Sequence, residues 1–203
     1  PDSRGTALQP LVRPRPVPVY IAAMGPDNLR LTGEVADGWL GNAFIPESAE
    51  VFLDPIREGA ESAGRTLADL DLVAPVAVEF HDSSQDTAAA ARRHADGYAF
   101  TIGAMGTGGT NFYNDAFTRL GYGEQVEEVS RLWQSGQRDE ARAAVPLDLG
   151  RLTNLLGSTT EVAERIAAYR DTGIGTLLAK IDGDHSHQLR TIERLLEATS
   201  RSH

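Results

Sequence analysis

The chain has 203 residues, of which 41% are hydrophobic and 24% charged, so it can form one domain with a sizeable core and is not a disordered protein. Its formal net charge of -10 argues against nucleic acid and anionic membranes as partners, because an acidic surface repels phosphate groups. The absence of cysteine excludes disulfides, thiolate metal ligands and cysteine catalysis. The sequence has neither an apolar run of membrane-spanning length nor a secretory signal, and we expect a cytoplasmic protein.

The first predicted β/α unit follows a lead-in rich in proline and arginine. Residues 1–16 are expected to be extended, because proline disfavours helices and lacks an amide donor. The apolar run at 17–23 is continuous, as in a strand buried on both faces. Gly25 and Pro26 end that run, and a helix is expected from about residue 27 to residue 36.

A second unit begins with a strand at 36–40. The helix that follows, around residues 48–63, is expected to end at Gly64, a plausible C′ residue. Pro55 lies within this stretch, which predicts that the regular helix begins only near Asp54, with the proline in its first turn.

The third unit has a strand at 70–80 and an alanine-rich helix at about 85–98. Residues 100–150 show no clear strand and are predicted to form two or three short helices. Ser158 and Glu161 then match a capping box, in which each side chain satisfies the other residue's free amide.

A last strand at 176–181 precedes a final helix, so strands and helices alternate along the chain. This order predicts an α/β protein with right-handed units and a parallel sheet. The pattern fits a small open sheet and half of an eight-stranded barrel equally well.

The most informative segment lies where the first strand meets the first helix, and it consists of Ala22, Ala23, Met24, Gly25 and Pro26. Its small side chains allow a ligand to approach the backbone, and a helix start presents free N–H groups and the positive end of a dipole. These features are those of a phosphate cradle. A tight turn that binds nothing is common and fits the same residues.

Two other polar groups follow predicted strands. Residues 182–187 combine aspartate and histidine, but their spacing matches no standard metal site, so a solvated loop with a helix cap is favoured and no metal is predicted. His81 and Asp82 are interpreted in the same way. No serine stands in a nucleophile-elbow context, so nothing supports nucleophilic catalysis.

Residues 20–40 (YIAAMGPDNLRLTGEVADGWL) resemble the segment from the fifth to the sixth strand of luciferase-like oxidoreductases, particularly the branch that uses the deazaflavin coenzyme F420. Those proteins carry a similar small-residue turn with Gly-Pro, then a helix, then Ala-Asp-Gly before an apolar strand. The likeness continues through further segments, namely 55–65, 73–78, 111–114, 120–122, 145–146 and 157–178.

The resemblance implies a TIM-type (β/α)8 barrel of which this chain supplies the C-terminal half, strands 5–8. Residues 17–203 would be one incomplete domain, with a helical insert at about 100–150 before the last strand. The turn from Ala22 to Pro26 would bind the cofactor phosphate, with coenzyme F420 expected first and FMN as the alternative. The family's first four units supply many catalytic side chains, so no catalytic residue is assigned.

The activity implied is hydride transfer or monooxygenation on a small organic substrate. The alternative is a non-catalytic remnant that binds a cofactor or a partner, and an unrelated α/β fold with a phosphorylated ligand at the same turn is a third interpretation. A half-barrel leaves two sheet edges unpaired, so we expect a second copy of the chain or a separate N-terminal half as partner.

Overall fold

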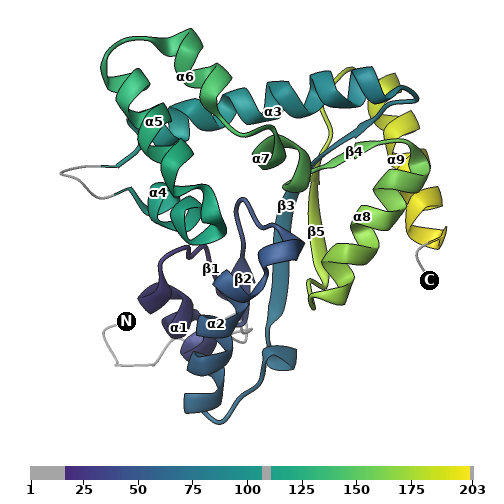
Figure 1. Ribbon diagram of the computed structural model, residues 1–203. Helices are drawn as coiled ribbons and strands as arrows, with labels where there is room; N and C mark the ends of the chain where they lie inside the picture. Colours follow the sequence, from purple (N-terminus) through teal and green to yellow (C-terminus); the bar gives the residue numbers. More distant parts are fainter. Residues whose placement is uncertain (1–16, 107–110, 202–203) are drawn as a thin grey trace, which may run out of the picture.

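The computed structural model describes residues 17–106 and 111–201, so the lead-in predicted for residues 1–16 lies outside the described part. Within it, strands alternate with helices around one sheet (Figure 1). The strands are β1 (Tyr20–Ile21), β2 (Gly38–Leu40), β3 (Asp71–Phe80), β4 (Leu155–Gly157) and β5 (Thr176–Lys180). The helices are α1 (Pro26–Val35), α2 (Glu50–Ser62), α3 (Ser84–Ala104), α4 (Phe112–Phe117), α5 (Gly123–Gln134), α6 (Arg138–Ala144), α7 (Leu147–Leu152), α8 (Thr159–Asp171) and α9 (His185–Arg201), with the short turns η1 (Pro46–Ser48), η2 (Leu67–Asp69) and η3 (Thr118–Tyr122).

The long strand β3 organises the sheet. Its first part pairs with β2 and β5, for example at Val73, which is level with both Leu40 and Thr176. Its last three residues pair with β4, and β1 lies outside β2. Every pairing is parallel, so the predicted α/β fold with a parallel sheet is confirmed.

One face of β3 carries the main core. Alternate residues of the strand are buried there, as the period of two requires, namely Leu72, Ala74, Val76 and Val78. They meet a cluster of aromatic side chains from β2, the segment after it, α2 and α8, namely Trp39, Phe44, Phe52 and Tyr169. Helices α1, α2 and α8 therefore cover the same face of the sheet, as in consecutive right-handed units.

Three local predictions need correction. The first strand is shorter than the apolar run at 17–23, because only Tyr20 and Ile21 pair with β2. A strand at Leu155–Gly157 was not expected, since three residues carry no periodic signal. The regular helix does not begin near Asp54, because α2 starts at Glu50 and contains Pro55 in its interior.

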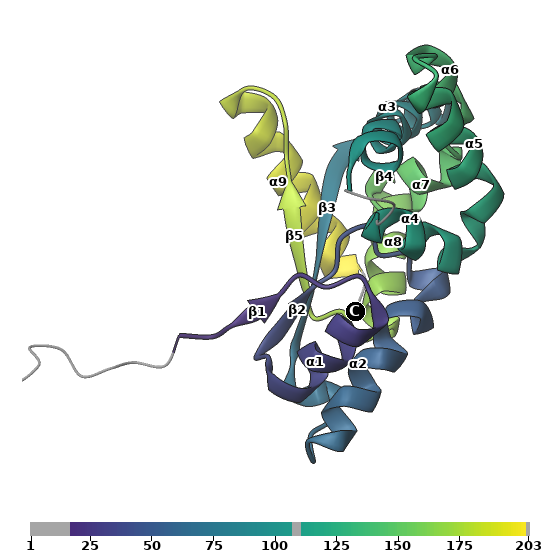
Figure 2. The same ribbon diagram turned by 90° about the vertical axis from the view of Figure 1, so that its left-hand side faces the viewer.

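Helices fill the stretch between α3 and β4, as predicted, but the described part has four of them, α4 to α7, where two or three were expected. The helix expected at 85–98 extends to Ala104, with Ser83 as its N-cap. Helices α3 to α7 share a second apolar core, separate from the one on β3. At one contact the helices touch through Gly150, whose missing side chain lets α7 approach the carbonyl of Ala91. Figure 2 shows this helical group and the pair β5–α9 on opposite sides of β3.

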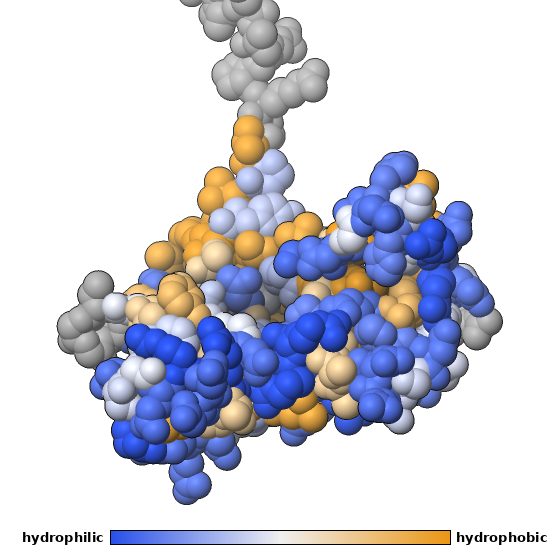
Figure 3. Space-filling model, turned by 90° about the horizontal axis from the view of Figure 1, so that it is seen from above, coloured by the Kyte–Doolittle hydropathy of each residue, from blue (hydrophilic) through white to orange (hydrophobic). Residues whose placement is uncertain are grey.

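Both edges of the sheet carry exposed apolar side chains. Val19, beside β1, and Leu178, in β5, are 58% and 57% exposed. The helices next to these edges add further exposed residues, namely Leu31 and Val35 of α1 and Leu189, Ile192 and Leu196 of α9. Seen from above, hydrophobic residues gather beside the N-terminal segment, and hydrophilic residues cover most of the rest of that view (Figure 3). No helix in the described ranges is long and apolar enough to cross a membrane.

Candidate functional site

The turn between β1 and α1 presents the start of a helix without a side-chain cap. Gly25 is the N-cap residue, and because glycine has no side chain it offers no capping oxygen to the first amides of α1. Pro26 occupies the first helical position, where a missing N–H costs nothing. The N–H groups of Asp27 and Asn28 come next in the first turn, where no carbonyl four residues earlier in the helix can accept from them. This end of α1 can therefore donate to an anion.

Two side chains hold the carbonyl groups of the turn. The indole Nε1 of Trp39, which is fully buried in β2, donates to the carbonyl of Ala23 at 3.0 Å. A guanidinium Nη2 of Arg119 donates to the carbonyl of Met24. The peptide bonds of the described residues are trans, so an N–H points away from the carbonyl of the preceding residue. The Gly25 N–H therefore points away from Arg119.

The space at Gly25 is open. Its φ of -80° and ψ of 148° suit any residue, so the backbone does not require glycine there. Among the described residues, a Cβ built on Gly25 would meet only Phe112, at the ordinary distance of 3.9 Å to Cδ1. By contrast, a Cβ on Gly33 of the same helix would lie 2.0 Å from the carbonyl oxygen of Ile56. Packing thus requires glycine at position 33 but not at position 25, where a ligand can approach the backbone.

Arg119 belongs to η3, a turn kinked at Gly121, whose φ of 94° favours glycine. Its guanidinium also lies 5.8 Å from the ring centre of Phe52. Burial lowers the pKa of Arg119, and the charge of Asp115 opposes that shift. Its Nε is buried and has no hydrogen-bond partner among the described residues. No sequence pattern indicates a role for this residue, since 95 positions separate it from Met24.

A second polar cluster surrounds Glu79 near the end of β3. Its carboxylate accepts from His94 and Arg93, each at 2.7 Å, and lies 3.3 Å from Nε2 of His81. Burial raises the pKa of Glu79, but the hydrogen bond from His94 and the charge of Arg93 outweigh it and hold the pKa below its usual value. The predicted pair is therefore divided: His81 joins Glu79, whereas Asp82 forms an ion pair with Arg194 at 3.1 Å.

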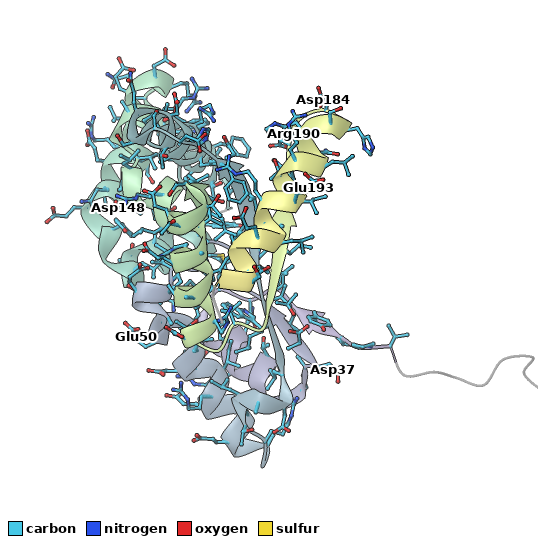
Figure 4. All side chains as sticks on the ribbon, turned by 90° about the vertical axis from the view of Figure 1, so that its right-hand side faces the viewer. Asp37, Glu50, Asp148, Asp184, Arg190 and Glu193 are labelled. Atoms are coloured by element: carbon cyan, nitrogen blue, oxygen red, sulfur yellow. The ribbon has the colours of Figure 1, made fainter. Side chains whose placement is uncertain are left out.

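Residues 182–187 form the loop and helix start predicted for them. Asp184 accepts from the backbone N–H of His187 at 2.8 Å, at the beginning of α9. Asp182 pairs with Lys180 at 3.3 Å. In the described ranges, no three His, Asp or Glu side chains are grouped so as to hold a metal ion. Figure 4 shows acidic residues of α7, of the loop before α9 and of the segment after α1 (labelled Asp148, Asp184 and Asp37) far apart.

Three cavities in the described part of the chain lie elsewhere. One, of about 350 Å³, is mostly lined by apolar residues of α8, β5 and α9. A second, of about 420 Å³, is lined mainly by residues of α7 and α8, including Arg151 and Arg165. A third, of about 340 Å³, is lined by Glu79, Arg93, Lys180 and residues near the start of α9. None of the three includes the turn between β1 and α1.

Comparisons with known proteins identify relatives of the chain. The sequence is 30% identical over 196 residues to a Mycobacterium tuberculosis protein whose name marks it as a candidate coenzyme F420-dependent oxidoreductase, covering 95% of this chain and 55% of that protein. It is 28% identical over 158 residues to the 5,10-methylenetetrahydromethanopterin reductase of Methanopyrus kandleri, covering 78% of this chain and 43% of that protein. The chain thus spans about half the length of these relatives.

Solved structures give the same picture of the fold. The coenzyme F420-dependent tetrahydromethanopterin reductase from Methanopyrus kandleri superposes with a TM-score of 0.66 at 23% identity, covering 91% of this chain and 50% of that one. An F420-dependent secondary alcohol dehydrogenase superposes with a TM-score of 0.60 at 17% identity. The sequence profile described as luciferase-like monooxygenase matches residues 2–176. The chain belongs to the luciferase-like monooxygenase family.

Proposed function

We propose that this chain is the phosphate-binding portion of an oxidoreductase that uses the deazaflavin coenzyme F420 on a small organic substrate. The names of the relatives support this cofactor, since both the Mycobacterium tuberculosis and the Methanopyrus kandleri proteins are associated with coenzyme F420. FMN with monooxygenation is the alternative within the family. A bound deazaflavin supplies the hydride chemistry, and the protein's part is to bind and orient it.

The observation that carries the proposal is the unused space at Gly25. Neither the φ of -80° nor the packing of the described residues around it calls for glycine, since within that part a Cβ would touch only Phe112, at 3.9 Å. A site that keeps glycine without a conformational reason suits the close approach of a ligand to the backbone. The residues proposed to hold the phosphate are Ala22, Ala23, Met24, Gly25 and Pro26.

The test is a fluorescence titration of the chain with coenzyme F420 and, in parallel, with FMN. Gly25→Val should weaken binding by at least about tenfold, because it blocks hydrogen bonds from the turn to a charged group. The matched control is Gly97→Ala in α3, where a Cβ meets no atom of the described residues within 4 Å and binding should be unchanged. Equal affinities of the wild type and Gly25→Val would contradict the assignment of the turn.

We also propose a partner that covers the two open edges, either a second copy of the chain or an N-terminal β/α half. The support is the pair of exposed apolar edges at Val19 and Leu178. Analytical ultracentrifugation should show a dimer if the partner is a second copy. If the partner is an N-terminal β/α half, a complex should form when that half is added. A stable monomer that unfolds cooperatively and binds no second half would contradict this. A chain that assembles but binds neither cofactor would favour the non-catalytic remnant.

A further inference from the structure

The helical group between α3 and β4 reaches the phosphate turn through Arg119. We propose that Arg119 is a positioning residue: it fixes the Met24–Gly25 peptide so that the Gly25 N–H faces the cofactor phosphate. This inference rests on the function proposed above and makes the helical insert part of cofactor recognition.

Arg119 is held in place by a carbonyl of α2 that lacks its helical hydrogen bond. Pro55 has no N–H, so the carbonyl of Val51, four residues earlier, loses the donor it would have in an unbroken helix. Arg119 Nη1 donates to that carbonyl at 3.1 Å. Because the guanidinium is a rigid planar fork, a bond from Nη1 to α2 restricts where Nη2 can donate. Nη2 then meets the carbonyl of Met24.

The orientation of the turn depends on that second bond. A planar trans peptide places the Met24 carbonyl and the Gly25 N–H on opposite sides, so holding the carbonyl on the Arg119 side turns the N–H away from it. Glycine allows a wide range of backbone angles, so this peptide can rotate when its carbonyl is released. The glycine that leaves space for a phosphate therefore also makes the orientation of the turn depend on the hydrogen bond from Arg119.

The positive charge of Arg119 also favours an anion at the turn. Arginine stays protonated at neutral pH, and Arg119 places a cation against the backbone of the turn, next to the positive end of the α1 dipole. Its buried Nε has no partner in the described part of the chain, so the charge is not cancelled there by an ion pair. The nearby carboxylate that acts on it is that of Asp115.

The chain offers a matched control at the other end of α1. Arg65 donates to the carbonyls of Gly33 and Ala36 at 3.0 and 2.7 Å, so it also ties two backbone groups together. It lies at the C-terminal end of the helix, away from the turn. Arg65→Met should therefore lower stability without changing the recognition of a phosphate.

The experiment compares FMN with riboflavin, which differ only in the phosphate. We expect wild-type chain to bind FMN more tightly, and Arg119→Met to weaken FMN binding by about tenfold while riboflavin changes less than about twofold, as expected for one oriented bond to a charged group. Arg119→Lys keeps the positive charge but lacks the planar fork, so its FMN affinity should lie between those of the wild type and Arg119→Met. Arg65→Met should keep the wild-type ratio of FMN affinity to riboflavin affinity. Urea unfolding should show that each variant is folded.

A second readout needs no flavin. In amide NMR spectra, inorganic phosphate should shift the signals of Gly25, Asp27 and Asn28 in the wild type, and the Gly25 shift should be lost in Arg119→Met. A folded Arg119→Met variant that keeps both the FMN preference and the Gly25 response would overturn the role of Arg119 and leave the phosphate turn intact. Wild-type chain that responds neither to inorganic phosphate nor to the phosphate of FMN would overturn the phosphate-binding role of the turn, and this inference with it.

Discussion

The contact between α1 and α2 gives the sharpest test of the packing beneath the site. A Cβ on Gly33 would lie 2.0 Å from the carbonyl oxygen of Ile56 and 2.6 Å from the amide nitrogen of Ala60, both in α2. An ordinary carbon-to-oxygen contact is about 3.3 Å, so Gly33→Ala must separate the two helices by roughly 1.3 Å. Overpacking against a backbone costs about 2–3 kcal/mol, a large part of the ~5–15 kcal/mol that stabilises a domain.

The assay is equilibrium unfolding in urea, with thermal unfolding alongside. A loss of about 2–3 kcal/mol should lower the melting temperature by about 4–12 °C for a chain of this size. Gly97→Ala is the control, because its Cβ has no neighbour within 4 Å in the described ranges and a helix gains roughly 0.5–1 kcal/mol from alanine. Unfolding midpoints that coincide for Gly33→Ala and the wild type would refute the argument from close backbone packing.

Two further predictions concern charge and capping. Because the pKa of Glu79 is lowered in the folded chain, its stabilising effect should be complete above its usual value of 4.5 and be lost as pH falls toward the folded pKa. The stability difference between the wild type and Glu79→Gln, measured by urea unfolding, should thus shrink below about pH 4.5, and a constant difference across this range would argue against the ion pairs. Ser158→Ala removes the acceptor for the Glu161 N–H and should cost about 1 kcal/mol in the same assay, and an unchanged stability would show that the cap contributes nothing.

Local features of the chain were predictable where the cause is local. The capping box at Ser158 and Glu161 is confirmed, with both hydrogen bonds formed, because it needs only residues three positions apart. Gly64 follows the end of α2 with a φ of 71°, as a C′ glycine does. The parallel sheet followed from the alternation of strands and helices. The phosphate role of residues 22–26 stays a prediction.

The errors arise where distant residues decide the structure. Strand β4 is fixed by its partner, since Asn154, just before it, accepts from the N–H of Ala77, 77 positions away. The predicted start of α2 was too late because Pro55 was taken to end the helix on its N-terminal side, without a donor from elsewhere in the chain. The carbonyl of Val51 that it leaves without a donor is satisfied by Arg119, 68 positions away. A proline inside a helix therefore signals a donor elsewhere in the chain, but not which residue supplies it.

The same contacts explain how an acidic chain could hold a phosphate. With a net charge of -10, the protein has no general attraction for anions, so recognition has to come from groups that face the ligand. Backbone N–H groups at a helix start can supply it without added side-chain charge, but only if their peptides cannot turn. Trp39 holds the carbonyl of Ala23, Arg119 holds that of Met24, and the glycine contact at Gly33 fixes α1 on α2. Affinity for the phosphate should therefore depend on the placement of three separate elements more than on any one side chain at the turn.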